Sequence, residues 1–227
     1  MKLPRIIIAD DHALVAEALC KLAGPYSEIV ATVGDGRALL EIAPALKPDI
    51  VVLDLAMPLL NGLDAGKELK KRLPNVKIIF LTMNEDPDLA LEAMRSGANG
   101  YLLKQSAGSE LLDAIRAAAA GMAYITPKIA RGVRESFIRD PHGTRRDKSI
   151  TPRQREVVQL LAEGKPMKTV ADILKVTPRT VAFHKYRVMQ DLGLKTNAEL
   201  VQFAMRNKII VQQSEDQESS LTASACT

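Results

Sequence analysis

Short runs of apolar, β-branched residues alternate with longer amphipathic stretches over roughly the first 120 residues of the chain. The apolar runs end at turn or charged residues, which is typical of buried strands. The predicted strands are Arg5 to Ala9, Ile29 to Val33, Ile50 to Asp54, Lys77 to Thr82 and Gly100 to Leu103. The predicted helices are His12 to Leu22, Gly36 to Leu46, Asn61 to Leu73, Pro87 to Ser96 and Ser109 to Gly121. This alternation predicts an α/β fold, a doubly wound five-stranded parallel sheet with helices on both faces.

The pattern changes after residue 121. Residues 130–149 contain Gly, Pro, mixed charge and little apolar periodicity, which indicates a linker whose first residues can form a helix. Four helix patterns then follow: Pro152 to Glu163, Met167 to Leu174, Pro178 to Leu192 and Asn197 to Asn207. Three of these begin after a threonine that is a good N-cap: Thr151, Thr177 and Thr196. We therefore expect an α/β domain over residues 3–121, a linker over 122–148, a small all-α domain over 149–211 and a disordered polar tail over 212–227.

The composition is that of an ordinary globular protein, with 47% apolar and 26% charged residues. No apolar run approaches the roughly 18 residues of a membrane helix, and the first residues lack the pattern of a secretory signal. We expect a cytoplasmic protein that does not bind membranes. The two cysteines, Cys20 and Cys226, show no CxxC spacing, which argues against a disulfide framework or a structural zinc site.

Charge is distributed unevenly along the chain. Residues 1–130 carry a net charge of −2, residues 131–211 carry +9 and residues 212–227 carry −3, for a total of +4. This distribution predicts that the helical part, rather than the α/β part, meets a polyanion such as nucleic acid. The alternative is a solvated cationic face with no specific partner.

Carboxylates follow two of the predicted strands. Asp10 and Asp11 come directly after the first strand, and Asp54 ends the third. In a sheet of strand order 2-1-3-4-5, the carboxyl ends of strands 1 and 3 meet at the switch point where ligands bind. Three neighbouring carboxylates repel one another unless a cation lies among them, and oxygen ligands of this kind suit Mg²⁺. The sequence therefore predicts a magnesium site.

Two further side chains fit a phosphate at the same edge of the sheet. Thr82 ends the fourth strand with a hydroxyl that can donate to a phosphoryl oxygen, and Lys104 follows the fifth strand with an ammonium that can neutralise it. Together with the three carboxylates they form a coherent phosphoryl-acceptor site. The alternative is that each aspartate only caps a helix or turn. Gly62 to Lys67 lacks the length and the Ser or Thr of a P-loop, so no nucleotide site competes.

Four stretches follow one another within residues 3–121: IIIADDH (6–12), VVLDLAMPLLNG (51–62), FLTM (80–83) and GYLLK (100–104). With these stretches, the region resembles the receiver domain of bacterial two-component response regulators. It implies that Asp54 accepts a phosphoryl group from a sensor histidine kinase. It also implies that Mg²⁺ is bound by Asp11, Asp54 and the carbonyl of Ala56, with Asp10 acting through water, that Thr82 and Tyr101 form a switch pair, and that Lys104 binds phosphoryl oxygens.

The third helix of the all-α region, Pro178 to Leu192, has two different faces. Because an α-helix turns by 100° per residue, one face of this helix carries Val181, His184, Val188 and Leu192, which we expect to pack. The other face presents Arg179, Ala182, Phe183, Tyr186 and Gln190. Such a face suits the DNA major groove, which admits a helix. The alternative is an ordinary helical bundle with a cationic exterior.

Residues 149–207 resemble the LuxR-type helix-turn-helix of the NarL/FixJ class of response regulators, with Thr151-Pro152-Arg153, Val170-Ala171, Thr180-Val181 and Leu192-Gly193 among the matching positions. The resemblance implies that Pro178 to Leu192 is the recognition helix and that the last helix pairs output domains. The family commonly has Lys at position 182, where this chain has Ala, and a polar or small residue near Phe183. The DNA-binding residues we predict are Lys165, Lys168, Arg179, Ala182, Phe183, Lys185, Tyr186 and Arg187.

The two parts together predict a transcription regulator, and not an enzyme. Phosphorylation of Asp54 changes the receiver surface, favours a homodimer and directs the basic domain to double-stranded promoter DNA. One alternative is a phosphorylation-independent regulator that uses the receiver as an interaction module. Another is an α/β phosphohydrolase with Asp54 as a transient nucleophile, for which the sequence shows no separate acid.

Overall fold

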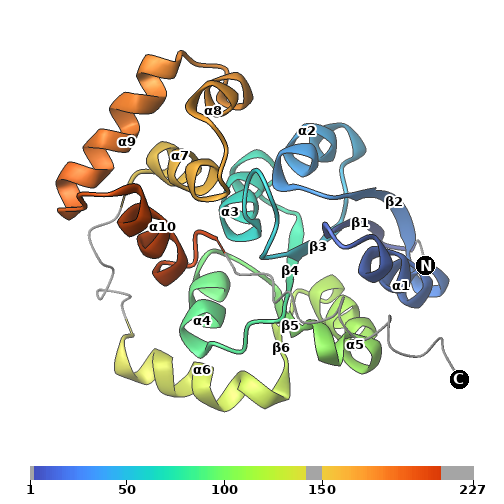
Figure 1. The fold of residues 1–227 in the computed structure, drawn as a ribbon. Helices are drawn as coiled ribbons and strands as arrows, with labels where there is room; N and C mark the ends of the chain where they lie inside the picture. Colours follow the sequence, from blue (N-terminus) through green and yellow to red (C-terminus); the bar gives the residue numbers. More distant parts are fainter. Residues whose placement is uncertain (1–2, 142–149, 211–227) are drawn as a thin grey trace, which may run out of the picture.

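The computed structural model describes residues 3–141 and 150–210, which fold into an α/β domain and a smaller helical domain (Figure 1). The predicted tail over residues 212–227 and the last part of the predicted linker, residues 142–148, lie outside the described residues.

A parallel sheet forms the centre of the α/β domain. Its strands are β1 (Arg5–Ala9), β2 (Glu28–Val33), β3 (Ile50–Asp54), β4 (Lys77–Thr82), β5 (Gly100–Leu103) and β6 (Tyr124–Ile125). They are ordered β2-β1-β3-β4-β5-β6, and every pairing is parallel. The predicted doubly wound sheet and its order over the first five strands are confirmed. The sequence did not predict the sixth strand.

Five helices cover the two faces of the sheet: α1 (Ala13–Ala23), α2 (Gly36–Leu46), α3 (Gly62–Arg72), α4 (Pro87–Arg95) and α5 (Ala107–Ala119). Alternate strand residues point to opposite faces, so Ile7 and Val51 pack with α2, α3 and α4, whereas Ile8 and Val52 pack with α1 and α5. Both faces are therefore buried, which explains why the strands are almost continuously apolar.

The chain segment after α5 packs against the α/β domain instead of leaving it. β6 pairs with β5, and α6 (Pro127–Arg139) then packs against α4, with Ile129 and Val133 buried in the core of the α/β domain. The Thr126 hydroxyl donates to Glu110 and accepts the N–H of Leu103, which ties this segment to β5. Much of the segment that the sequence predicted as a linker is thus a sixth strand and a helix.

The helical domain contains α7 (Pro152–Ala162), α8 (Met167–Leu174), α9 (Pro178–Leu192) and α10 (Asn197–Arg206). The predicted threonine caps are present: Thr151, Thr177 and Thr196 each accept a backbone N–H from the first turn of α7, α9 and α10 respectively. Small apolar clusters hold α7 against α8, α9 and α10. Within residues 3–141 and 150–210, no helix is long and apolar enough to cross a membrane.

Candidate functional site

Three carboxylates converge at the carboxyl ends of β1 and β3. Asp10 and Asp54 are almost fully buried, with 4% and 1% of their surface exposed, and Asp11 lies at the rim. Ligand atoms of Asp10, Asp11, His12 and Asp54 all lie within 4.8 Å of one another. The sequence predicted the three aspartates but not His12, whose Nδ1 lies 2.8 Å from Asp11 Oδ1. This cluster has the oxygen donors and the charge to hold a divalent cation.

Lys104 reaches into the same cluster from the end of β5. Its Nζ lies 2.8 Å from Asp54 Oδ2 and 2.9 Å from Asp10 Oδ2. The other oxygen of Asp54, Oδ1, accepts the N–H of Ala56 at 3.1 Å. Both carboxylate oxygens of Asp54 are therefore engaged by donors.

Burial and charge act in opposite directions on this pair. Burial raises the pKa of Asp54, and Asp10 adds to this, while Lys104 acts to lower it. Burial of the Lys104 ammonium disfavours its charge, yet the carboxylates of Asp54 and Asp10 outweigh that effect and raise its pKa. The ammonium thus stays charged beside Asp54, where it can neutralise an incoming phosphoryl group.

Thr82 and Tyr101, the residues of the switch pair that the resemblance implies, both bond to the backbone of Asn84. Thr82 is 1% exposed, and its Oγ1 accepts the N–H of Asn84 at 3.0 Å. The Tyr101 ring is fully buried and its hydroxyl donates to the carbonyl of Asn84 at 3.0 Å. Burial, with Asp86 nearby, raises the pKa of the Tyr101 phenol. Both side chains are therefore bonded to the start of the loop between β4 and α4.

The loop after β3 passes close to the backbone of Asp54 because a glycine stands at its end. A Cβ added to Gly62 would lie 1.9 Å from the carbonyl oxygen of Asp54, far inside contact distance. The Gly62 N–H donates to the Leu55 carbonyl at 3.0 Å, which closes the loop over residues 55–62. Glycine at this position lets the loop carry Ala56 back over the carboxylate.

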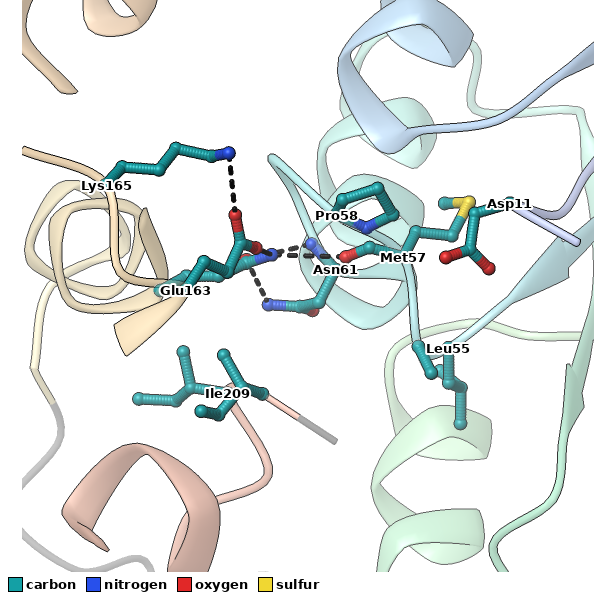
Figure 2. A pocket seen from close by; sticks show the side chains of 11 residues that line it. Asp11, Leu55, Met57, Pro58, Asn61, Glu163, Lys165 and Ile209 are labelled. Carbon is teal, nitrogen blue, oxygen red and sulfur yellow. Dashed lines mark hydrogen bonds and ion pairs between the residues drawn. The ribbon is translucent and has the colours of Figure 1, made fainter. Parts of the chain in front are cut away.

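A cleft of about 390 Å³ opens beside this loop, between the two domains. Figure 2 shows Asp11, Met57 and Asn61 on the α/β domain facing Glu163, Lys165 and Ile209 on the helical domain. The sequence predicted Lys165 as a DNA contact, whereas its Nζ lies 3.9 Å from Glu163 Oε2 at this cleft. The sequence did not predict the contact between the domains.

The exposed face of α9 carries most of the residues predicted to contact DNA. Phe183 and Tyr186 are 64% and 60% exposed, which is high for aromatic side chains. Ala182 is partly exposed beside them. Arg179 and Arg187 are exposed on the same helix, and Lys168 is exposed on α8. Figure 1 shows α9 at the edge of the helical domain, with α7 between it and the α/β domain.

Lys185 does not lie on that face. It is 7% exposed and occupies the packed side of α9 with Val181, Val188 and Met189. Its position follows from helix geometry, because residue 185 lies one turn after Val181. The exposure that a phosphate contact requires is therefore absent at Lys185 in this arrangement.

Two families match the chain. Residues 6–116 match the family described as the response regulator receiver domain, and residues 148–204 match the bacterial regulatory proteins of the luxR family. Together these matches define a class of protein, the DNA-binding response regulator, in which a receiver precedes a luxR-type domain.

Several proteins are similar to the chain over most of its length. A Bacillus subtilis protein described as an uncharacterized transcriptional regulatory protein, YxjL, is 35% identical over 91% of this chain and 97% of its own. The oxygen regulatory protein NreC of Staphylococcus aureus is 33% identical over 91% of this chain and 99% of its own. The chain therefore belongs to the family of response regulators that combine a receiver with a luxR-type DNA-binding domain, which are transcriptional regulators and not enzymes.

Solved structures agree with this membership. The response regulator RcsB of Salmonella typhimurium has a TM-score of 0.57 and 27% identity, over 89% of this chain and 98% of that one. A structure of an RcsB–DNA complex has a TM-score of 0.56 and 27% identity over the same shares. A luxR-family response regulator from Aurantimonas has a TM-score of 0.58 and 32% identity, over 60% of this chain and 99% of that one.

Proposed function

We propose that Asp54 is the phosphoacceptor of this response regulator and that a sensor histidine kinase supplies the phosphoryl group. The observation that carries the proposal is the position of Asp54, which is buried at the end of β3 among Asp10, Asp11 and Lys104. A carboxylate oxygen of Asp54 forms the new P–O bond, and the bond between phosphorus and the donor nitrogen breaks. Lys104 then neutralises charge on the phosphoryl oxygens.

Mg²⁺ is the cation that best suits this cluster. The residues that would hold it are Asp11 and Asp54, with the carbonyl of Ala56 and with Asp10 acting through water. The bound ion supplies positive charge that offsets the charge of the carboxylates and the phosphoryl group. The chain itself orients Asp54 through the Ala56 N–H and through Lys104.

The exposed face of α9 is proposed to enter the major groove of promoter DNA. Phe183, Tyr186 and Ala182 offer apolar contacts to base edges such as the thymine methyl group. Basic side chains around them, on α8 and α9, contact phosphates and set the position of the helix: Lys168, Arg179 and Arg187. Lys165 lies at the cleft between the domains and Lys185 lies on the packed face of α9. Each of them contacts DNA phosphates only if that part of the structure opens. Phosphorylation favours a homodimer that binds paired half-sites.

The proposal is tested by phosphorylation and DNA binding of the full chain and of Asp54→Asn. We expect acetyl phosphate with Mg²⁺ to label the parent chain and to strengthen its selective binding to promoter fragments at fixed salt. Asp54→Asn should take no label and should show no strengthening. Undiminished labelling of Asp54→Asn would contradict the assignment of Asp54. Selective binding that ignores the phosphodonor would favour a phosphorylation-independent regulator.

A further inference from the structure

The exposed face of α9 is apolar where a recognition helix contacts bases. Ala182, Phe183 and Tyr186 lie in the first part of the helix, and the two rings are largely exposed. Phe183 and Tyr186 are three residues apart, so the helix places them as neighbours, with about 5–6 Å between their Cβ atoms. In a helix-turn-helix, the first residues of the recognition helix contact base edges. The two rings therefore stand where sequence is read.

Polar side chains surround this apolar centre. Arg179 lies one turn before Phe183, and the guanidinium of Arg187 lies 3.2 Å from the carboxylate of Asp191. Gln190, which has an amide that could pair with adenine, lies about 10 Å further along the helix than Phe183. Base contacts at the centre of the face therefore fall to the two rings.

A phenyl ring recognises a base edge through apolar contact, because it carries no hydrogen-bonding atom. The apolar group that the major groove offers is the C5-methyl of thymine, whereas a G·C pair presents acceptors and a donor there. A ring that covers those polar groups removes their water without replacing the hydrogen bonds, which costs free energy. The same contact thus favours a T·A pair and disfavours a G·C pair.

Lys185 contacts the ring of Tyr186 from the packed side of the helix. Its Nζ lies 5.3 Å from the centroid of the ring, within the range of a cation–π interaction. The lysine is 7% exposed, so packing of its alkyl chain restricts where the ammonium can lie. A ring that is oriented before binding loses less conformational entropy on DNA. This contact gives Lys185 a role in DNA binding that does not require it to touch a phosphate.

The ring of Phe183 also has an oriented neighbour. It meets the imidazole of His184 edge to face, with 5.6 Å between the ring centroids and an angle of 70° between the planes. His184 is half-buried, so the helical domain supports this contact from below. Both exposed rings are therefore held at their base by the residue that follows or precedes them.

We propose that Phe183 and Tyr186 read thymine methyl groups and that Lys185 is a positioning residue for the ring of Tyr186. The proposal rests on the proposed entry of α9 into the major groove. Successive base pairs lie about 3.4 Å apart, so the two rings face thymines one or two steps apart in each half-site. The net charge of +9 over residues 131–211 attracts DNA to this face, which favours DNA over an apolar protein surface as its partner.

The test removes the methyl group from the DNA and keeps the base pair. The full chain, treated with acetyl phosphate and Mg²⁺, first selects its site from duplexes with a randomised centre. Each thymine of that site is then replaced by deoxyuridine, which keeps the hydrogen-bonding groups of thymine and lacks its methyl. We expect two replacements in each half-site to weaken binding about four-fold each, the change for burial of one methyl-sized group. The other replacements should leave the affinity unchanged.

Variants of the protein assign the effect to the two rings. Phe183→Ala should bind the thymine and deoxyuridine duplexes equally at one of the two positions, and Tyr186→Ala should do so at the other. Tyr186→Phe is the matched control, because it removes the hydroxyl and keeps the ring, and it should retain the four-fold difference. Lys168→Ala should weaken binding to both duplexes by the same factor.

Lys185→Met separates positioning from phosphate contact, because it removes the ammonium and keeps an apolar chain on the packed side of α9. We expect a loss of discrimination between thymine and deoxyuridine at the position of Tyr186, with an unchanged slope of log affinity against log salt. A phosphate contact would behave in the opposite way, with the slope reduced by about 1 and the discrimination intact. That result would overturn the role of Lys185.

The outcomes separate this proposal from the proposed function. Selective binding that ignores every deoxyuridine would overturn the reading of methyl groups and leave DNA binding by α9 standing. A four-fold difference that persists in both Phe183→Ala and Tyr186→Ala would overturn it as well, since other residues would then contact the methyl groups. If the parent chain selects no sequence, the proposed function fails and this proposal fails with it. That failure is distinguishable because it appears on DNA that retains all its thymines.

Discussion

The strand-end pocket and the exposed face of α9 are built in opposite ways. In the pocket, Asp10, Asp54 and Thr82 are buried on a rigid parallel sheet. On α9, Phe183 and Tyr186 project from a small helical domain into solvent. The pocket suits a small, highly charged group that a few fixed donors can surround, whereas the helix suits a long groove that receives side chains.

This difference predicts different responses to mutation. The pocket depends on close backbone packing, so substitutions that add a single carbon should be costly there. The face of α9 is not packed, so substitutions there should affect binding and leave folding intact. Four changes test this contrast, from the largest expected effect to the smallest.

Gly62→Ala should destabilise the receiver by about 3 kcal/mol, because the new Cβ overlaps the carbonyl oxygen of Asp54. Urea unfolding followed by circular dichroism measures this change. Gly108→Ala on α5 is the control, since nothing lies within 4 Å of its Cβ position and alanine favours a helix. Equal stability of the two variants would contradict the close approach at Gly62.

Phe183→Ala should weaken selective DNA binding by about 1–3 kcal/mol and leave the free energy of unfolding unchanged. The side chain is 64% exposed, so its removal leaves no cavity. Fluorescence anisotropy with a selected promoter fragment measures the affinity. Phe137→Ala, which removes an exposed ring on α6, should bind DNA as the parent chain does. A large loss of stability in Phe183→Ala would show that the ring packs within the domain.

Thr151→Ala should destabilise the helical domain by about 1 kcal/mol, because it removes the capping box at the start of α7. Thermal unfolding of the full chain, compared with Thr169→Ala on the exposed side of α8, measures the effect. Thr169→Ala should be neutral or slightly stabilising, since alanine is the better helix former. A neutral Thr151→Ala would mean that tertiary contacts alone hold the start of α7.

Lys168→Ala should weaken DNA binding about equally for all sequences and reduce the slope of log affinity against log salt by about 1. The side chain is exposed at the start of α8. Titrations at several salt concentrations measure the slope, with Lys21→Ala on α1 as a control far from α9. An unchanged slope would exclude Lys168 from the phosphate contacts.

Local patterns in the sequence predicted most of the fold. β1, β3, β4 and β5 have the predicted bounds, because each is a short apolar run that ends at a turn or a charge. The order of the carboxylates along the strands also predicted that Asp10, Asp11 and Asp54 would meet. These features depend on residues close together in the sequence or on the rules of parallel sheets.

Features that depend on distant pairing could not be predicted in this way. Gln159 has no local signal that distinguishes it from a solvent-facing glutamine, because its partners lie on the loop after β3. β6 is too short for a strand pattern and forms because the edge of β5 is available. The burial of Lys185, in contrast, could have been predicted from the sequence. Residue 185 lies four residues after Val181 and therefore on the packed side of α9.

The sixth strand also determines where the two domains can be separated. An isolated receiver that ended at Gly121 would leave the outer edge of β5 without its partner and Leu103 without the hydroxyl of Thr126. An open strand edge of this kind promotes self-association and aggregation. A receiver fragment that is to stay monomeric should therefore extend through α6, to Arg139, and its behaviour would then reflect phosphorylation and not an exposed edge.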